Sequence, residues 1–474
     1  MSSVLLHNAS PIITFRILFN TGAASDPKGK EGVAALTAAM ISQGGSRSLT
    51  YEQIVRAMYP MAAKFDSQTD KEMTVFAGQT HIDNLEGYYG LIKGMLLDPG
   101  WRRDDFSRVR QDALNFLRVN LRGDNDEELG KEEMYNFIYR GTPYGHMNVG
   151  TVESLERLTI DDVKEFYSKN YCGENVVLGL AGGYPDGFAS RVEADLSGTL
   201  SPAAVQPAVA SQPEKISRLQ MEIVEKETRG SAICFGFPIS ITRADADWPA
   251  LLVAQSYIGQ HRSTNSHLFQ VMRQIRGLNY GDYAYIEYFP GGMYLFHPSP
   301  NLGRRHQIFH VWIRPVEPHN ALFALRMGLY ELRKLVEAGI SPEDFESTRR
   351  FLGKFVNVLT ATQNAQLGYA LDSKFYGIPE FTSYVREKLA ALTVADVNQA
   401  IKKYLQADDI KIVVVTKDAA GFRRAALDGK PSPISYSAPV PPEVLEEDKL
   451  IERYGLNFDA DNVSIVPVDQ VFQR

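Results

Sequence analysis

Two sets of side chains in this sequence have residue types and a spacing that could bind a metal ion or transfer protons. His306 and His310 are four residues apart, and on a helix they could bind one metal ion. Residues 307–313 are rich in β-branched and aromatic side chains, however, and indicate a strand, where i and i+4 lie about 13 Å apart. Four glutamates, which could act as acids or bases, occur as pairs at 127–128 and 132–133. Their spacing predicts a charged, solvated helix face instead.

Arg273 and Tyr280, seven residues apart, offer hydrogen-bond donors rather than metal ligands. Arg273 lies in a segment whose apolar side chains recur at i, i+3, i+4 and i+7, which predicts a helix with a buried stripe. That stripe consists of Leu268, Val271, Met272 and Ile275. At about 100° per residue, Arg273 lies roughly 140° from Leu268 and so faces water or a cavity. We expect Ser266 to cap the helix, Gly277 to end it in a left-handed conformation, and Tyr280 to begin a strand.

The composition is that of an ordinary soluble protein with more than one domain. A chain of 474 residues exceeds what one compact core usually holds, and 44% hydrophobic with 23% charged residues is typical of globular proteins. The formal net charge of −7 argues against nucleic acid or an anionic membrane as the main partner. No apolar run is long enough for a membrane span. The two cysteines, Cys172 and Cys234, form no CxxC motif.

A repeat at half-chain spacing indicates two related domains. Residues 158–180 contain a Leu-Thr pair, an amphipathic helix, a tyrosine and an apolar strand, and residues 392–415 repeat that order. Thr159 and Thr393 are expected to cap the two helices. Both halves mix strands with long amphipathic helices, which predicts an α+β fold in which helices cover one face of a mainly antiparallel sheet. We place an N-terminal domain at 1–195, a linker at 196–215, a C-terminal domain at 216–425 and an extended, loop-like arm at 426–474.

Residues 26–40, Asp-Pro-Lys-Gly-Lys-Glu-Gly-Val-Ala-Ala-Leu-Thr-Ala-Ala-Met, resemble the zinc helix of the pitrilysin/insulinase family of metallopeptidases (inverzincins) together with its lead-in. Active members carry the motif HxxEH there, in which two histidines bind zinc and the glutamate is the general base. In this sequence the histidine positions fall on Ala35 and Ala39 and the glutamate position falls on Ala38. The third ligand, a glutamate in the family, aligns with Phe116. The resemblance therefore implies a peptidase scaffold that binds no metal in this chain.

Residues 266–280 resemble a second signature of that family, S-x-L-x-x-x-(I/L/M)-R-x-x-x-G-L-x-Y. In active relatives its arginine and tyrosine act in the zinc site of the opposing half or subunit. The resemblance implies that Tyr280 donates a hydrogen bond to the oxyanion of the transition state. It further implies that Arg273 holds Tyr280 or a substrate carbonyl. His146, in a Pro-Tyr-Gly-His loop found widely in the family, is expected to be structural.

Taken together, the resemblances imply the zinc-less subunit of a bacterial two-subunit endopeptidase. Two chains with the LuxS/insulinase-like fold would close like a clam shell around a peptide substrate, and an HxxEH-bearing homologous partner would hold the zinc. This chain would hold no cofactor. A purely structural role, and a homodimer that binds peptides without cleaving them, remain open. No signal peptide precedes the first strand, expected at residues 12–19, so the bacterial cytoplasm or the periplasm is expected, unless the start has been trimmed.

Overall fold

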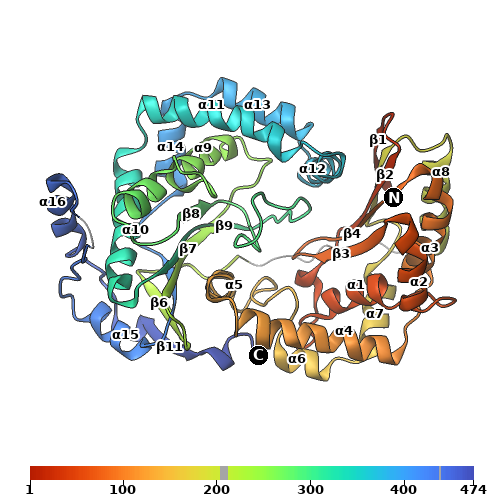
Figure 1. Cartoon of the computed structure of the whole chain (residues 1–474), viewed down its shortest axis with the longest axis horizontal. Helices are drawn as coiled ribbons and strands as arrows, with labels where there is room; N and C mark the ends of the chain where they lie inside the picture. Colours follow the sequence, from red (N-terminus) through yellow and green to blue (C-terminus); the bar gives the residue numbers. More distant parts are fainter. Residues whose placement is uncertain (203–211, 437–438) are drawn as a thin grey trace.

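The computed structural model describes residues 1–202, 212–436 and 439–474. It has two halves, each built on one β-sheet with helices around it (Figure 1). The first sheet has the strand order β1-β5-β2-β4-β3, in which β1 runs parallel to β5 and the other neighbours are antiparallel. The second sheet has the order β11-β6-β10-β7-β9-β8, with β6 parallel to both β10 and β11.

The first half contains five strands and most of the helices that precede residue 200. Its strands are β1 Ser2–His7, β2 Ile12–Phe19, β3 Lys64–Thr69, β4 Thr74–His81 and β5 Val176–Gly182. Its helices are α1 Val33–Gln43, α2 Tyr51–Met58, α3 Leu85–Leu97, α4 Arg103–Asn115, the π-helical η4 Phe116–Leu121, α5 Asp126–Tyr139, α6 Val152–Arg157, α7 Ile160–Asn170 and α8 Phe188–Thr199.

The second half repeats this alternation of strands and helices. Its strands are β6 Gln220–Glu225, β7 Ser231–Ile239, β8 Asp282–Tyr285, β9 Gln307–Val316, β10 Lys411–Thr416 and β11 Val463–Pro467. Its helices are α9 Trp248–Gly259, the π-helical η5 Phe269–Gln274, α10 Ala321–Ala338, α11 Pro342–Leu359, α12 Gln363–Tyr376, α13 Phe381–Ala391, α14 Val394–Tyr404, α15 Ala419–Leu427 and α16 Pro442–Ile451.

The strand orders confirm the predicted duplication and the α+β fold. In order across the sheet, β1, β5, β2, β4 and β3 correspond to β6, β10, β7, β9 and β8. The repeated Leu-Thr segments form α7 and α14, and both helices begin with a capping box. The Thr159 hydroxyl accepts from the Asp162 backbone N–H while the Asp162 side chain accepts from Thr159, and Thr393 and Asp396 repeat the arrangement. The same helix–strand unit therefore occurs twice, at equivalent positions of the two sheets.

Each sheet also receives a helix from the opposite half, which the sequence did not reveal. α12 packs on β1, β2 and β5 of the first sheet, and α5 packs on β7, β9 and β10 of the second. Neighbouring residues of β2 show the two covered faces. The Phe15 ring contacts Tyr88 of α3, whereas the Arg16 guanidinium donates to Asn364 of α12 at 2.9 Å. The prediction that helices cover one face of each sheet is therefore incomplete. The strands carry apolar or paired side chains on both faces, so both faces of the sheet need to be covered.

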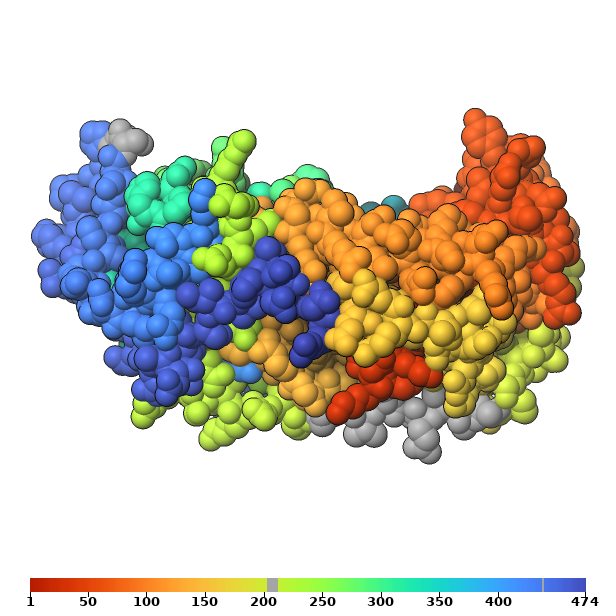
Figure 2. All heavy atoms as spheres, turned by 90° about the horizontal axis from the view of Figure 1, so that it is seen from below, coloured from red at the N-terminus to blue at the C-terminus, as the bar shows by residue number. Residues whose placement is uncertain are grey.

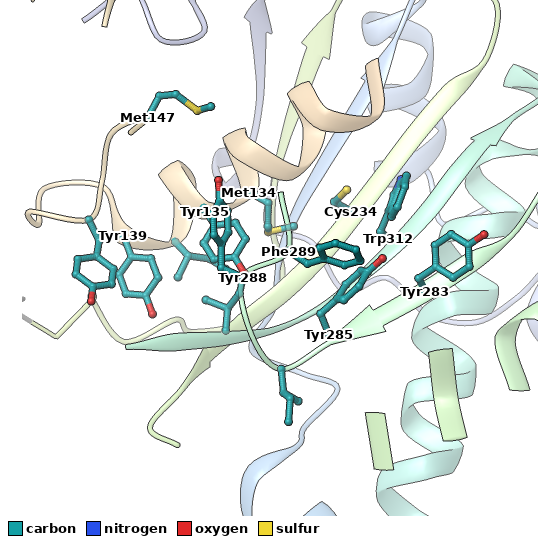
Figure 3. Packing of buried hydrophobic residues seen from close by; sticks show 14 of the residues in the cluster. Met134, Tyr135, Tyr139, Met147, Cys234, Tyr283, Tyr285, Tyr288, Phe289 and Trp312 are labelled. Carbon is teal, nitrogen blue, oxygen red and sulfur yellow. The ribbon is translucent and has the colours of Figure 1, made fainter. Parts of the chain in front are cut away.

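α5 lies between the halves, and Figure 3 shows Met134 and Tyr135 of this helix directed toward the second sheet. The Tyr135 ring lies 4.9 Å from that of Tyr288. The prediction of a solvated glutamate face on this segment is wrong, because Glu127, Glu128, Glu132 and Glu133 are all buried. Their partners are Arg314 for Glu127, Lys131 for Glu128, Tyr288 for Glu132 and Arg140 for Glu133. Some of these partners come from the other half of the chain, so local charge patterning could not indicate the burial.

A buried ion pair joins the two halves beside α5. Asp70, in the turn between β3 and β4, accepts two hydrogen bonds from the Arg304 guanidinium just before β9. The two side chains are 0% and 2% exposed. The neighbouring pair, Arg305 with Glu72, spans the same junction, but the Arg305 side chain is 55% exposed. Water is therefore excluded from the Asp70–Arg304 pair but reaches Arg305. Removing one partner should cost more stability in the buried pair than in the exposed one.

The predicted loop-like arm, residues 426–474, is only partly a loop. It contains α16 and then β11, which joins the edge of the second sheet beside β6. Pro442 is the first residue of α16, a position where proline is favoured, so this proline starts a helix instead of marking a loop. Figure 2 shows the end of the chain lying against the first half, where the backbone N–H of Val152 donates to the Phe472 carbonyl at 3.0 Å.

The strand expected at residues 12–19 is β2, with those bounds, and a further strand, β1, precedes it. α8 ends at Thr199, inside the predicted linker, and residues 203–211 of that linker lie outside the described residues. The predicted domain boundaries stay predictions. None of the described helices combines the length and apolar character that a membrane crossing requires.

Candidate functional site

The segment that resembles the zinc helix forms α1, and its lead-in fixes where the helix begins. The buried carboxylate of Asp26 accepts hydrogen bonds from the backbone N–H groups of Gly32 (2.6 Å) and Ala34 (2.9 Å). Burial raises the pKa of Asp26. Gly32 has φ +97°, and a Cβ there would lie 2.4 Å from the Val149 carbonyl oxygen, so only glycine fits. The start of the helix is therefore held by a buried cap and a close backbone contact.

The four positions of the degenerate zinc site carry no metal ligand. Ala35 and Ala39 are half-buried, one turn apart on α1, and Ala38 is 1% exposed in the hydrophobic core. Phe116 opens the π-helical η4 after α4 and is 39% exposed. Methyl and phenyl groups offer no lone pair, so these residues do not fit zinc. Across residues 1–202, 212–436 and 439–474, no group of three or more His, Cys, Asp or Glu side chains could hold a metal ion.

Arg273 and Tyr280 are brought together in the second half. The Arg273 guanidinium donates to the Tyr280 backbone carbonyl at 2.9 Å and lies over the rings of Phe269 (4.6 Å) and Tyr280 (5.7 Å). The Tyr280 side chain is 72% exposed. Among the described residues, no hydrogen bond involves its hydroxyl, which is free to donate to a group from outside. The arrangement is a fixed arginine that steadies an exposed phenol.

The helix that carries Arg273 departs from the predicted geometry. Residues 269–274 form the π-helical η5, whose turn is wider than that of an α-helix. Leu268 and Met272 are buried as predicted, but Ile275 is 40% exposed because the wider turn moves it off the stripe. Gly277 has φ +64°, which confirms the predicted left-handed end. Tyr280 lies two residues before β8 rather than at the start of the strand.

Two further anchors of this segment escaped the sequence analysis. Arg276, whose side chain is 1% exposed, donates to Asp448 and Glu447 of α16, both at 2.8 Å. Asn279 braces the turn that carries Tyr280, because its amide donates to Asp282 at 2.6 Å and its carbonyl accepts from the Gly281 N–H at 3.1 Å. Arg276 meets partners more than 160 residues away, and no local pattern could have shown them. Gly277 and Asn279, two residue types that favour turns, were the available signal for the turn.

Asp282 makes this turn sensitive to pH. Its side chain is fully buried, one carboxyl oxygen has no partner among the described residues, and burial raises its pKa to about 8 against the opposing effect of Arg314 and Arg273. Because the folded pKa exceeds the unfolded value, the folded state binds the extra proton. The stability that this proton contributes is complete at low pH and is lost progressively as pH rises toward 8.

We therefore expect Asp282→Asn, which cannot ionise, to be more stable than the wild type at neutral pH. The difference in free energy of unfolding should be near zero at pH 4 and grow by about 1.4 kcal/mol per pH unit up to pH 8. Urea denaturation of both proteins at pH 4.5, 6 and 7.5 measures it. A difference that does not change with pH would show that Asp282 does not titrate in this way.

The histidines singled out in the sequence are not metal ligands in this fold. The prediction of a strand is confirmed, since His310 lies in β9 and His306 immediately precedes it. The buried His310 ring stacks on Tyr285 at 4.8 Å, and burial lowers its pKa. His146 is buried near Asp26, and its Nδ1–H donates to the Met147 carbonyl at 2.8 Å. Burial lowers the pKa of His146 to about 3, so it is neutral at pH 7.

Comparisons with known proteins agree with this fold. The family model described as Insulinase (Peptidase family M16) matches residues 3–151, and the model described as Peptidase M16 inactive domain matches residues 157–352. An uncharacterized zinc protease from Rickettsia bellii is 20% identical over 417 residues, covering 86% of this chain and 94% of that protein. A non-peptidase homolog from Helicobacter pylori is 19% identical over 415 residues, covering 86% of this chain and 89% of that protein.

Among solved structures, a peptidase M16 inactive domain from Pseudomonas fluorescens superimposes with a TM-score of 0.75 at 21% identity, covering 87% of this chain and 94% of that one. Two tandem α+β domains, with a helix at the metal-motif position of the first, define a metallopeptidase-like protein. The chain belongs to the insulinase family, peptidase family M16, since the two family models together span most of its length.

Proposed function

We propose that this chain is the zinc-less subunit of a two-chain M16 endopeptidase that hydrolyses peptides. The observation that carries the proposal is the Arg273–Tyr280 pair, with its exposed phenol, in a chain whose own motif positions are Ala35, Ala38 and Ala39. A chain without a metal has no catalytic use for such a pair unless another subunit brings the metal. The partner is a homologous subunit with the HxxEH motif, and zinc belongs to that partner.

In the assembled enzyme a zinc ion held by the partner would supply Lewis-acid chemistry, and Tyr280 of this chain would act on the substrate carbonyl. The Tyr280 hydroxyl donates to the oxygen of the scissile carbonyl, on which negative charge develops in the transition state. Arg273 keeps the tyrosine in place through its hydrogen bond to the backbone and its contact with the ring. Arg276, tied to α16, keeps the helical segment of Arg273 from shifting. The remaining surface of this chain forms one wall of the peptide chamber.

The alternative is a structural or peptide-binding protein without a peptidase role. The Helicobacter pylori relative, whose name describes a non-peptidase homolog, supports that alternative. The exposed Tyr280 hydroxyl favours the peptidase pair, because a purely structural chain gains nothing from a tyrosine that is 72% exposed and held by an arginine.

Purification of the tagged chain from its source organism tests the proposal. We expect a companion of similar size with an HxxEH motif, one zinc per pair, and peptide hydrolysis by the pair that a chelator abolishes. Neither subunit alone should hydrolyse the peptide. A chain that purifies alone or only with copies of itself, or a companion without the motif, would contradict the proposal and favour the alternative.

A further inference from the structure

The second half contains a pocket that the proposed chemistry does not use. It lies between α9, α11 and α13 on one side and residues 285–289 and 298–302 on the other. Its empty space is about 930 Å³ when the open mouth is included. Apolar side chains make most of the wall, among them Leu252 of α9 and Leu352, Phe355 and Val356 of α11. A concave, mainly apolar site with a few fixed polar groups is typical of ligand pockets.

The duplication places this pocket beside the helices that correspond to α1 and α4 of the first half. In the first half α1 packs against α4, α7 and β3, and in the second half α9 packs against α11, α14 and β8. β3 and β8 end their sheets at equivalent positions, so α9 and α11 correspond to α1 and α4. Beside this helix pair the first half has the half-buried Ala35 and Ala39 and the exposed Phe116, whereas the second half has the pocket.

The charged groups of the pocket wall are already paired. The Arg243 guanidinium donates to Glu287 at 2.8 and 2.9 Å and to Asp372 at 3.4 Å. Trp248 also donates to Glu287, at 3.1 Å. These groups leave no free charge for a ligand, so a charged occupant would lose its hydration without gaining a partner.

His261 of the wall is neutral, and both of its ring nitrogens are hydrogen-bonded. Its Nε2–H donates to the Leu295 carbonyl at 2.9 Å, because a carbonyl can only accept, and its Nδ1 then accepts from the Tyr285 hydroxyl at 2.7 Å. Burial lowers the pKa of His261 to about 4, so it carries no charge at pH 7. The wall is therefore apolar and electrically neutral.

Exposed apolar side chains surround the mouth. The Phe351 ring, 39% exposed, stacks at 5.1 Å on Phe355 of the wall. Leu295, whose carbonyl is bonded to His261, is 38% exposed, and the adjacent Phe296 is 64% exposed beneath Arg262. Apolar side chains gathered around an apolar pocket mark a surface that a partner covers.

We propose that this pocket binds one bulky uncharged side chain, aromatic or long aliphatic, of an extended peptide. The proposal rests on the proposed function in that it names the substrate class for which the chain provides a chamber wall. The charged groups of the wall are already paired, which disfavours acidic and basic side chains, and the apolar wall favours an aromatic or long aliphatic one. The site would give the assembled enzyme a hydrophobic preference away from the cleaved bond.

The test uses the full-length chain and two fluorescent peptides that differ only in one central residue, phenylalanine or alanine. Anisotropy titration should show roughly ten- to hundred-fold tighter binding of the phenylalanine peptide, the range expected for burying one such side chain. Val356→Trp, which fills the pocket, should reduce that binding to the level of the alanine peptide. Val358→Trp is the matched control, since Val358 lies on the same helix, is 51% exposed and is not part of the wall.

Ser299→Trp, on the opposite wall of the pocket, is measured as well. It provides a second test of the pocket if Val356→Trp does not fold. Equal binding of the two peptides, or equal effects of Val356→Trp and Val358→Trp, would overturn the proposal. The outcome is separable from the proposed function. Failure of the pocket leaves the effect of Tyr280 on turnover intact, and failure of the two-chain enzyme leaves the phenylalanine preference of this chain intact.

Discussion

Replacing Tyr280 by phenylalanine is expected to lower peptide turnover by the assembled pair about 10²–10³-fold, the usual cost of losing one oxyanion donor. The substitution removes only the hydroxyl, which has no hydrogen-bond partner among the described residues. The fold should therefore keep its stability to within about 0.5 kcal/mol. The donor acts mainly on the charge of the transition state, so kcat should fall while KM stays nearly constant.

Steady-state kinetics on a fluorogenic peptide measure this effect with the co-purified complex. Tyr59→Phe is the matched control, because Tyr59 is 85% exposed in the first half and belongs to no signature. It should leave both kinetic constants unchanged. Unchanged turnover with Tyr280→Phe would remove the catalytic role from this chain and leave the structural alternative. A complex that fails to assemble would instead show that Tyr280 belongs to the subunit interface, which also contradicts the proposed role.

Replacing Arg304 by methionine is expected to destabilise the chain by about 3–5 kcal/mol, since it leaves Asp70 as an unpaired charge in the interior. Both side chains are almost completely buried, and among the described residues the Asp70 carboxylate would keep only the hydrogen bond from Asn148. The pair joins the turn before β4 to the segment before β9, so the loss should loosen the junction of the two halves. Urea denaturation should show a lower midpoint of the first transition.

Two controls separate the buried charge from a general effect of removing arginine. Arg305→Met removes the neighbouring, half-exposed side chain and should cost about 1 kcal/mol or less. The double variant Arg304→Met/Asp70→Leu removes both charges and should recover most of the loss, because no unpaired carboxylate remains. Equal destabilisation by Arg304→Met and Arg305→Met would show that burial of the ion pair is not what matters.

Several features of this fold could be read from short stretches of the chain. The helix caps of Thr159 and Thr393 formed as predicted, and each is part of a capping box with the aspartate three residues later. The left-handed conformation of Gly277 follows from glycine at the end of an apolar stripe. The exposed Ile275 shows the limit of such reasoning, because a helical period of 3.6 does not anticipate a π-helical turn.

The residues of the candidate site could be predicted from the sequence, but the residues that hold them in place could not. The alanines at the motif positions exclude metal binding by these side chains whatever the fold, because an alanine methyl group has no lone pair. Arg273 and Tyr280 followed from the resemblance of their segment to a known signature. Arg276 and Asp282 did not, because their roles depend on α16 and on burial at the edge of the second sheet.

The duplicated α+β fold, the starts of β2, α7 and α14, and the residue types without a metal-binding atom at positions 35, 38, 39 and 116 all followed from the amino-acid sequence. These properties depend on residue type, periodicity and contacts between near neighbours. The three-dimensional structure was needed to show that the α5 glutamates are buried, that α5 and α12 pack on the opposite sheets, and that a neutral pocket opens beside α9 and α11. The physical reason is that burial and pairing depend on side chains hundreds of residues away, and a local pattern has no information about them.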